Sequence, residues 1–417
     1  MTYNLLNYRN STSYCTFSQN NPLTKEQNLK TIVQYIQPDI LVCNELGDAP
    51  TNADFILLNS LNTSGVTYYE KAPYSNNSFS SLANAMFYNS EKFALKSQQV
   101  VTQDLNGSSL VRVIDLYRLY YKDSLLTNQS DTVYFTVVAA HLKAGSAAGD
   151  LSERTDATAA LMQFIANNVD DENVLMCGDL NIYKSQEGAY QNLTQYSNTS
   201  VRFYDPLNQP GNWGNNGSFA QLHTQSTRST ATNGGCFSSG GLDDRLDHIL
   251  ITNEVRDNLK GMRYLPNTYH AVGNDGLHFN KAITDDANNS VPANVLNAIY
   301  DLSDHLPVVA EFEIKRQQIG VDENILFAAQ IKFANPVNNF LELTLTSANA
   351  KNPKARILSV TGAEMHKANL QKTGANFSFS CDVSHLAKGL YFIEITTSNG
   401  LRSVKKMVKL WCRSLRQ

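Results

Sequence analysis

Short apolar runs alternate with polar segments along residues 1–315, and several of the runs end in a polar or charged side chain. The runs at 1–8, 39–43, 133–139 and 174–177 have the lengths of strands. Their polar ends are Asn4, Glu45, His141, and Asp179 with Asn181. A carboxylate directly after four apolar residues is costly to bury unless it is paired or bound to a metal. The pattern therefore predicts strands whose ends carry functional groups.

Helical patterns lie between these strands. From Thr24, apolar residues at 29, 32, 33 and 36 form one face, Thr24 and Gln27 match a capping box, and Pro38 ends the helix. A second helix is predicted from about Ser152, and a shorter one covers 55–61. Strands interleaved with helices predict a mixed α/β domain.

Two long polar segments, 205–241 and 264–300, interrupt this pattern. A structureless segment this long in a compact domain is usually functional or disordered. Strands are predicted to follow at 242–251, which contains Asp247, and at 302–312, which contains Asp304-His305 just before a proline. A carboxylate beside an imidazole can hold a divalent cation and transfer a proton. On its own, such a pair is more often an ordinary loop end.

The pattern changes after residue 315. Residues 325–412 contain short alternating runs at 341–345, 355–360, 390–395 and 404–410, separated by Gly, Asn and Ser turns. No candidate catalytic cluster occurs there. This region is predicted to be a small all-β sandwich, joined through a linker near 315–324.

Composition excludes some classes of protein. A hydrophobic content of 42% and a charged content of 17% are typical of a folded, soluble chain. The net charge of −4 argues against a nucleic-acid storage protein, which needs a basic face, but not against an enzyme that contacts a few phosphates. The sequence has no apolar run of about 20 residues that could span a membrane. No signal peptide is recognised, because Met1 already stands in the first predicted strand, so the chain is either cytoplasmic or carries its export signal upstream.

The six cysteines match no metal-binding spacing. Cys43 and Cys177 lie in apolar runs and are predicted to be buried thiols. Cys15 and Cys236 lie in polar loops, and they can pair only if folding brings the two loops together.

The polar strand ends together indicate a site. Each has an ordinary interpretation as a turn residue, but buried carboxylates and imidazoles need partners, and this number of them in one domain favours a shared cluster. Oxygen-rich ligands without cysteine suit Mg²⁺, Mn²⁺ or Ca²⁺ better than zinc. Phosphate-ester hydrolysis needs a metal, an activated water and donors to the phosphate oxygens, and this inventory of side chains matches those needs.

These residues resemble the endonuclease/exonuclease/phosphatase superfamily, which has the DNase I-like fold. The motifs occur in the family's order over about residues 1–314: Tyr3-Asn4, Asp39–Glu45, Ala140-His141-Leu142, Gly178-Asp179-Leu180-Asn181, Arg245-Leu246-Asp247-His248 and Ser303-Asp304-His305-Leu306-Pro307. The resemblance implies a four-layered α-β-β-α sandwich over residues 1–315, followed by the small all-β domain at 325–412.

The resemblance also implies roles for single residues. Glu45 would be the main metal ligand, with Asn4 close by and Asp304 either contributing to the metal site or orienting His305. Asp179 would orient the attacking water or act as base, Asn181 would hold the phosphate, and His141 would donate to it. His305 would be the catalytic imidazole, oriented by Asp247. One departure is that residues 82–88 contain no clear acidic partner for His141.

The C-terminal region resembles a type IX secretion sorting domain. The motifs are Asn335-Pro336-Val337, residues 357–362, residues 386–392 and the basic stretch 405–409. The resemblance implies a Gram-negative bacterial protein that is carried by the type IX machinery to the cell surface or the medium.

The leading hypothesis is a secreted, metal-dependent phosphodiesterase, most simply a monomeric endonuclease of DNA or RNA. Arg112, Lys143 and Arg228 are candidate phosphate contacts. One alternative is a sphingomyelinase-like phospholipid phosphodiesterase, with Trp213, Phe219 and Phe237 touching the membrane, although packing within the loop is the simpler explanation for these aromatics. Another alternative is a surface binding protein that has lost its activity.

Overall fold

The computed structural model describes residues 1–76, 79–123, 132–169, 173–315, 330–346, 350–374, 376–398 and 401–410. The chain forms two compact units, Met1–Gln317 and Gln318–Gln417. Apart from Lys315, the linker predicted near 315–324 lies outside the described residues.

Two six-stranded sheets form the first unit. The strand order of one sheet is β12 (His270–Ala271), β13 (Val308–Val309), β1 (Thr2–Tyr8), β2 (Ile40–Gly47), β4 (Leu82–Asn89) and β3 (Tyr69–Lys71). The order of the other is β5 (Phe93–Gln103), β6 (Ser109–Tyr121), β7 (Tyr134–His141), β8 (Asn173–Asp179), β10 (Asp247–Thr252) and β9 (Phe203–Tyr204). The pairs β1–β2 and β7–β8 are parallel, and the other neighbouring strands are antiparallel.

The two sheets share a buried core. Alternate side chains such as Val42 on β2, Val137 on β7 and Cys177 on β8 belong to one buried cluster and line one cavity between the sheets, so these strand faces pack together. The intervening residues of the second sheet, such as Val138 and Met176, pack in another cluster with helix α3. Both faces of these strands are therefore covered, which explains why their sequences are nearly continuous apolar runs.

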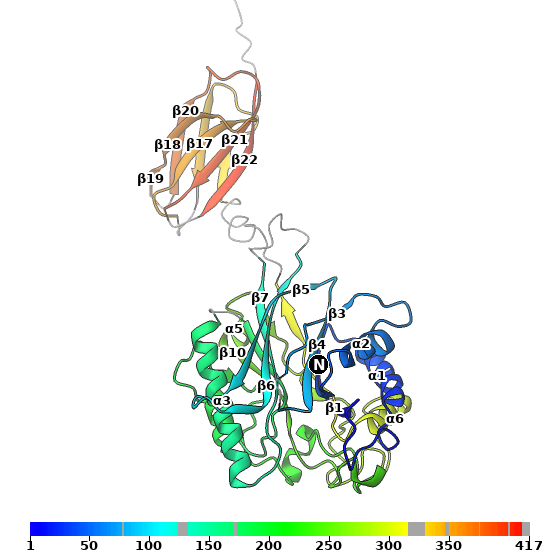
Figure 1. The fold of residues 1–417 in the computed structure, drawn as a ribbon. Coiled ribbons are helices and arrows are strands. Elements are labelled where there is room, and N and C mark those ends of the chain that lie inside the picture. Colours follow the sequence, from blue (N-terminus) through cyan, green and yellow to red (C-terminus); the bar gives the residue numbers. More distant parts are fainter. Residues whose placement is uncertain are drawn as a thin grey trace, which may run out of the picture. The chain divides into compact units, whose positions relative to one another are not determined.

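Helices form the two outer layers. Helices α1 (Pro22–Ile36), α2 (Asn52–Ile56) and α6 (Ala293–Leu302) lie on one side of the paired sheets, and α3 (Ala148–Asn168) lies on the other (Figure 1). The short helix α4 (Gly188–Thr194) shares the buried cluster of α3. This α-β-β-α arrangement confirms the predicted fold class. In the described part of the chain, no helix is both long and apolar enough to cross a membrane.

Some predicted boundaries were wrong. Helix α1 begins at Pro22, because the Asn21 side chain accepts hydrogen bonds from the backbone N–H groups of Leu23 and Thr24. Asn21 therefore caps the helix in place of the predicted box at Thr24, and proline suits the first helical position because it has no N–H to satisfy. Helix α3 begins four residues before Ser152, and the predicted helix at 55–61 divides into α2 and a π-helical turn, Leu57–Leu61.

Strands also form the second unit. One sheet has the order β15 (Ile331–Phe333), β16 (Phe340–Leu345), β20 (Asn376–Asp382) and β19 (Gln371–Thr373). The other has the order β18 (Glu364–Asn369), β17 (Lys354–Ser359), β21 (Gly389–Thr396) and β22 (Arg402–Lys409). Inward residues of both sheets, including Leu343 and Ile393, share one buried cluster, as expected of a small sandwich.

Candidate active site

The strand ends of the two central sheets meet at one edge of the sandwich. His141 and Asp179 are paired residues at the ends of the parallel strands β7 and β8. Asp247 begins the antiparallel strand β10 opposite Asp179. On the other sheet, β1 and β2 run parallel and carry Asn4 and Glu45. The parallel and antiparallel pairings therefore bring together residues that are far apart in the sequence.

An amide and two carboxylates form the centre of this cluster. Asn4 Nδ2 donates to Glu45 Oε1 and to Asp179 Oδ2, both at 2.9 Å. The other carboxylate oxygens accept backbone N–H groups, from Asn7 at 2.9 Å and from Asn181 at 3.0 Å. The register of β1 and β2 shifts beyond Asn4, and Glu45 has a φ of 63°. This irregularity lets the backbone supply N–H donors to a carboxylate.

His141 faces the two carboxylates. Its Nε2 lies 3.5 Å from Asp179 Oδ2 and 3.8 Å from Glu45 Oε1. Burial lowers the pKa of His141 well below its usual value, and Arg112 and His305 lower it further. The imidazole is therefore neutral at pH 7 and has a lone pair for a ligand.

Glu45, His141 and Asp179 have the composition of a cation site. One ligand atom from each lies within 4.8 Å of the others. Burial raises the pKa of Asp179, with Asp247 and Glu45 adding to the effect and His305 and Asn4 opposing it. A divalent cation would relieve the cost of holding these carboxylates together, so two carboxylates and one imidazole fit Mg²⁺ or Mn²⁺. His141 thus joins the cluster that could bind metal, whereas the sequence predicted it as a phosphate donor.

The pKa of a second histidine, His305, shifts in the opposite direction. His305 Nδ1 lies 2.8 Å from Asp247 Oδ2, and its Nε2 lies 3.8 Å from Asp179 Oδ2. Burial opposes a charge on His305, but Asp247 and then Asp179 raise its pKa well above the usual value. The backbone N–H of Asp247 donates to Thr224 Oγ1 at 3.2 Å, which fixes the start of β10. His305 is therefore an oriented imidazolium beside the carboxylates.

Asp304 does not join the metal cluster among the described residues. Its Oδ2 accepts hydrogen bonds from the backbone N–H and the hydroxyl of Ser238. Adjacent residues near a strand point to different sides, so the His305 side chain enters the cluster while that of Asp304 anchors the long polar segment. Both roles considered for Asp304, metal binding and orientation of His305, stay predictions.

Arg112 and Lys143 lie along a groove of about 380 Å³ that adjoins His141. Arg112 Nη1 donates to the backbone oxygen of Leu142 at 2.9 Å. Burial lowers the pKa of Arg112, and the nearby charges of Glu45 and Asp179 oppose this shift. Lys143 Nζ forms an ion pair with Asp150 Oδ1 at 2.6 Å. Both cations line the groove beside His141, and their roles as phosphate contacts stay predictions.

Arg228 is buried and does not line this groove, and its role as a phosphate contact stays a prediction. Its guanidinium carbon lies 3.9 Å from the ring centroid of Phe237 and 4.1 Å from that of Tyr300, and the side chain is 4% exposed. It also donates to Thr227 Oγ1 at 2.9 Å. Sequence alone cannot distinguish a solvated arginine from one stacked between aromatic rings.

The aromatic side chains of the long segment are also packed inside. Trp213 and Phe237 are 0% and 2% exposed, and Phe219 is partly buried against the same cluster as Trp213. Trp213 contacts the ring of Tyr190 and donates its indole N–H to the backbone oxygen of Gln209. These aromatics therefore serve packing, and Trp213 and Phe237 are not available to touch a membrane.

Sequence reasoning missed two amides next to the cluster. The Gln225 amide nitrogen lies 2.7 Å from His305 Nε2, and Asn44 Oδ1 accepts from the backbone N–H of Asp179 at 3.1 Å. Gln225 lies in a polar stretch without periodicity, so the sequence offers no signal for it. Asn44 directly follows an apolar strand and precedes Glu45, and this position could have indicated it.

Residues 82–88, which contain no clear acidic partner for His141, contribute the amide of Asn84 instead. Asn84 on β4 donates to Asp115 Oδ2 at 3.1 Å and accepts from Asn44 Nδ2 at 2.8 Å. His141 Nδ1 has no hydrogen-bond partner in the described part of the chain. Amides and a carboxylate therefore support the strands around His141 without orienting its ring.

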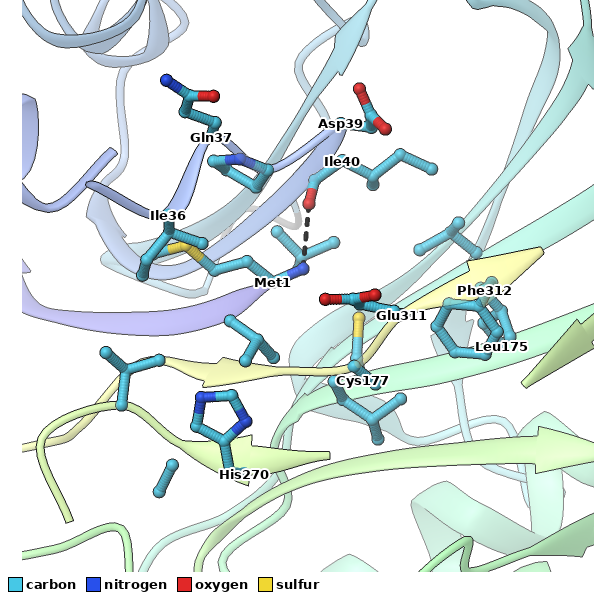
Figure 2. Close-up of a pocket in the computed structure, with 18 of the residues that line it drawn as sticks. Met1, Ile36, Gln37, Asp39, Ile40, Leu175, Cys177, His270, Glu311 and Phe312 are labelled. Carbon is cyan, nitrogen blue, oxygen red and sulfur yellow. Dashed lines mark hydrogen bonds between the residues drawn. The ribbon is translucent and has the colours of Figure 1, made fainter. Parts of the chain in front are cut away.

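A cavity lies away from this chemistry. It measures about 590 Å³ and opens between the two sheets at the opposite ends of the strands, with Leu175, Cys177, Phe312 and Met1 among its lining (Figure 2). The Met1 amine donates to the backbone oxygen of Ile40 at 3.0 Å there. None of the clustered carboxylates or imidazoles lines it, so its size does not identify it as the active site.

A comparison with protein families finds a match in the second unit. Residues 333–410 match the family model described as "Secretion system C-terminal sorting domain". No curated protein sequence matches the chain.

Solved structures resemble the chain over about three quarters of its length. One is the human Nocturnin catalytic domain, at 17% identity and TM-score 0.44, covering 70% of this chain and 87% of that one. Another is an endonuclease/exonuclease/phosphatase family protein from Bacteroides thetaiotaomicron, at 12% identity and TM-score 0.45, covering 76% and 97%. A third is the mannosyl-6-phosphatase Bt3783 of the same organism, at 13% and 0.45, covering 75% and 97%. At these values the likeness identifies no substrate.

Proposed function

We propose that the first unit of this chain, whose second unit belongs to the secretion system C-terminal sorting domain family, is a divalent-metal-dependent phosphoester hydrolase. One observation carries the proposal: a carboxylate pair, half-buried Glu45 and buried Asp179, faces a neutral His141 on one side and a carboxylate-oriented His305 on the other. Attack on a phosphate ester needs charge neutralisation, an activated water and a proton donor at one point, and this cluster can supply all of them.

Glu45, Asp179 and His141 would hold the cation, which when bound supplies positive charge to the phosphate oxygens. The chain's own groups provide the rest. His305, held by Asp247, would donate a proton or hydrogen bond to the phosphate. Asp179 would orient the attacking water or act as its base, from its position beside Glu45 and His141. Asn181 and Arg112 would hold the phosphate from the side of His141.

The sorting domain accounts for the location of the protein. A domain of this family marks its chain for the type IX secretion machinery and for release or attachment at the cell surface. The predicted localisation is thereby confirmed, and the substrate must be reachable outside the cell.

Nucleic acid is the first substrate to test. A phosphodiester backbone could contact Arg112 and Lys143 along the groove beside His141. With Mg²⁺ or Mn²⁺, purified protein is expected to degrade plasmid DNA or RNA, and His305→Ala or Asp179→Ala is expected to abolish cleavage. Intact nucleic acid beside turnover of bis-p-nitrophenyl phosphate would contradict the nuclease but not the hydrolase.

The two alternatives are tested by the same panel. The buried Trp213 and Phe237 remove the feature that suggested a phospholipid substrate. Release of phosphocholine from sphingomyelin liposomes would nevertheless establish that activity. A non-catalytic binding protein would turn over none of the substrates with metal present.

A further inference from the structure

We propose that the segment 223–241 positions the Asp304-His305 pair for hydrolysis and that the Cys15–Cys236 disulfide holds this segment in place, so that full activity requires the oxidised chain. The inference rests on the proposed hydrolase function. It assigns positioning roles to Gln225, Ser238 and a cross-link that the reaction itself does not involve.

Both residues of the catalytic pair are held by side chains of this segment. The Gln225 amide lies 2.7 Å from His305 Nε2, the ring nitrogen that faces the carboxylate cluster. Ser238 donates its backbone N–H and its hydroxyl to Asp304 Oδ2. The imidazole is thus held at Nδ1 by Asp247, and the Gln225 amide group lies against Nε2. Because both nitrogens of an imidazolium are donors, it is the amide oxygen of Gln225 that would accept from Nε2 of the charged ring.

The backbone of the segment follows the same pair. The N–H of Thr227 donates to the Asp304 oxygen at 2.9 Å, and the N–H of Leu306 donates to the Thr224 oxygen at 2.7 Å. Gln225 forms isolated β-bridges with His305 and with Asp244. These are single bridges and not a continuous ladder, so the segment depends on other contacts to keep its place.

The disulfide supplies such a contact. Cys15, in the loop after β1, is bonded to Cys236, and their Cα atoms are 4.6 Å apart although 221 residues separate them in the sequence. The two half-cystines form a small buried cluster with Leu6 and Phe237. Because Asn4 lies on β1 and Ser238 follows Phe237, the cross-link ties the segment that holds His305 to β1, the strand whose Asn4 donates to both carboxylates.

Stacking extends this cluster toward the pair. Phe237 lies against the guanidinium of Arg228, which donates to the backbone oxygen of Ser303 at 3.3 Å. Lys25 Nζ lies 5.4 Å from the Phe237 ring centroid and donates to the backbone oxygen of Leu5 at 2.8 Å. Movement of Cys236 would therefore be transmitted through Phe237 to residues next to Asp304.

The redox environment decides which form exists. Disulfides persist outside the cell and are reduced in the cytoplasm, and the sorting domain sends this chain outside. The enzyme would therefore reach full activity only after export.

The test compares oxidised and reduced full-length protein with Mg²⁺ and bis-p-nitrophenyl phosphate. Reduction by a phosphine, or the change Cys15→Ser/Cys236→Ser, is expected to lower kcat by about 10- to 100-fold, the usual effect of displacing a catalytic group by about 1 Å. KM is expected to change less than kcat, and reoxidation of the reduced chain restores the rate. The control Cys381→Ser removes a free cysteine of the second unit and is expected to change neither.

A combined variant shows whether the disulfide acts through the segment. Gln225→Ala/Ser238→Ala is expected to lower kcat in the oxidised chain, and reduction of that variant is expected to lower it little further, because the contacts are already lost. Full turnover by protein in which Cys15 and Cys236 are both shown to be free thiols would overturn the inference. It would also be overturned if the losses of kcat caused by the combined variant and by reduction multiplied as independent effects. An oxidised wild type that is itself inactive would instead contradict the proposed function.

Discussion

Buried histidines in this chain take opposite charge states according to their neighbours. Asp247 and Asp179 raise the pKa of His305 despite burial, whereas burial together with Arg112 lowers that of His141. Each of these two histidines lies near carboxylates in the folded chain. The distances to those groups decide which ring becomes charged, and the sequence does not show these distances. In the proposed hydrolase, an imidazolium and a neutral imidazole on two sides of the carboxylates would divide proton donation and metal binding between them.

The orientation of His305 by Asp247 gives the first prediction. Asp247→Asn is expected to lower kcat by about 10²- to 10⁴-fold near pH 7, because the ring loses the carboxylate that sets its tautomer and charge. Steady-state hydrolysis of bis-p-nitrophenyl phosphate measures this. The exposed Asp257→Asn serves as the matched control, and equal rates for the two variants would contradict the role of Asp247.

His248 gives a prediction about stability. Burial, and then Arg245, lower its pKa to about 3, while the unfolded chain has a histidine near 6.5. Protons therefore bind preferentially to the unfolded state between these values, and stability falls as the pH drops below about 6.5. From pH 7 to pH 5, the wild type is expected to lose about 2 kcal/mol more unfolding free energy than His248→Gln. Denaturant titrations followed by the fluorescence of the buried Trp213 measure this, and identical pH dependence in both proteins would contradict it.

At the scale of elements, the site depends on how closely strands β7 and β8 approach. Gly178, just before Asp179, has a φ of 137°, and a Cβ there would stand 1.9 Å from the Ala140 oxygen. Gly178→Ala is therefore expected to cost roughly 3 kcal/mol or more of unfolding free energy. Gly149→Ala, at an open position in α3, is expected to be neutral or stabilising by up to about 1 kcal/mol. Denaturant titration of both variants checks this, and a small cost at Gly178 would contradict the close approach.

The elements also show how far sequence reasoning reaches. Apolar runs predicted β1, β2, β7, β8 and β10 because both faces of these strands are buried, and the polar residues at their ends were recognisable for the same reason. The partners of Asp304 and His305 come from the long polar segment, where no period marks Gln225 or Ser238. The stacking of Arg228 could not be predicted either, because an arginine stacked on Phe237 and one that binds phosphate have the same appearance in a sequence.

At the scale of the molecule, each unit has its own buried core. Residues 1–315 alone are therefore expected to hydrolyse bis-p-nitrophenyl phosphate with a kcat/KM within about 2-fold of the full chain. Assay of the two proteins side by side measures this. A folded but inactive first unit would show that the sorting domain contributes to catalysis.

Metal-dependent turnover tests the central claim most directly. Bis-p-nitrophenyl phosphate hydrolysis should be measured after chelation and again after addition of Mg²⁺ or Mn²⁺. Wild-type turnover is predicted to disappear on chelation and to return with the metal, whereas Glu45→Gln is predicted to recover little at the same metal concentration. Turnover that persists without metal, or a Glu45→Gln variant that recovers like the wild type, would contradict a cation held by Glu45, Asp179 and His141.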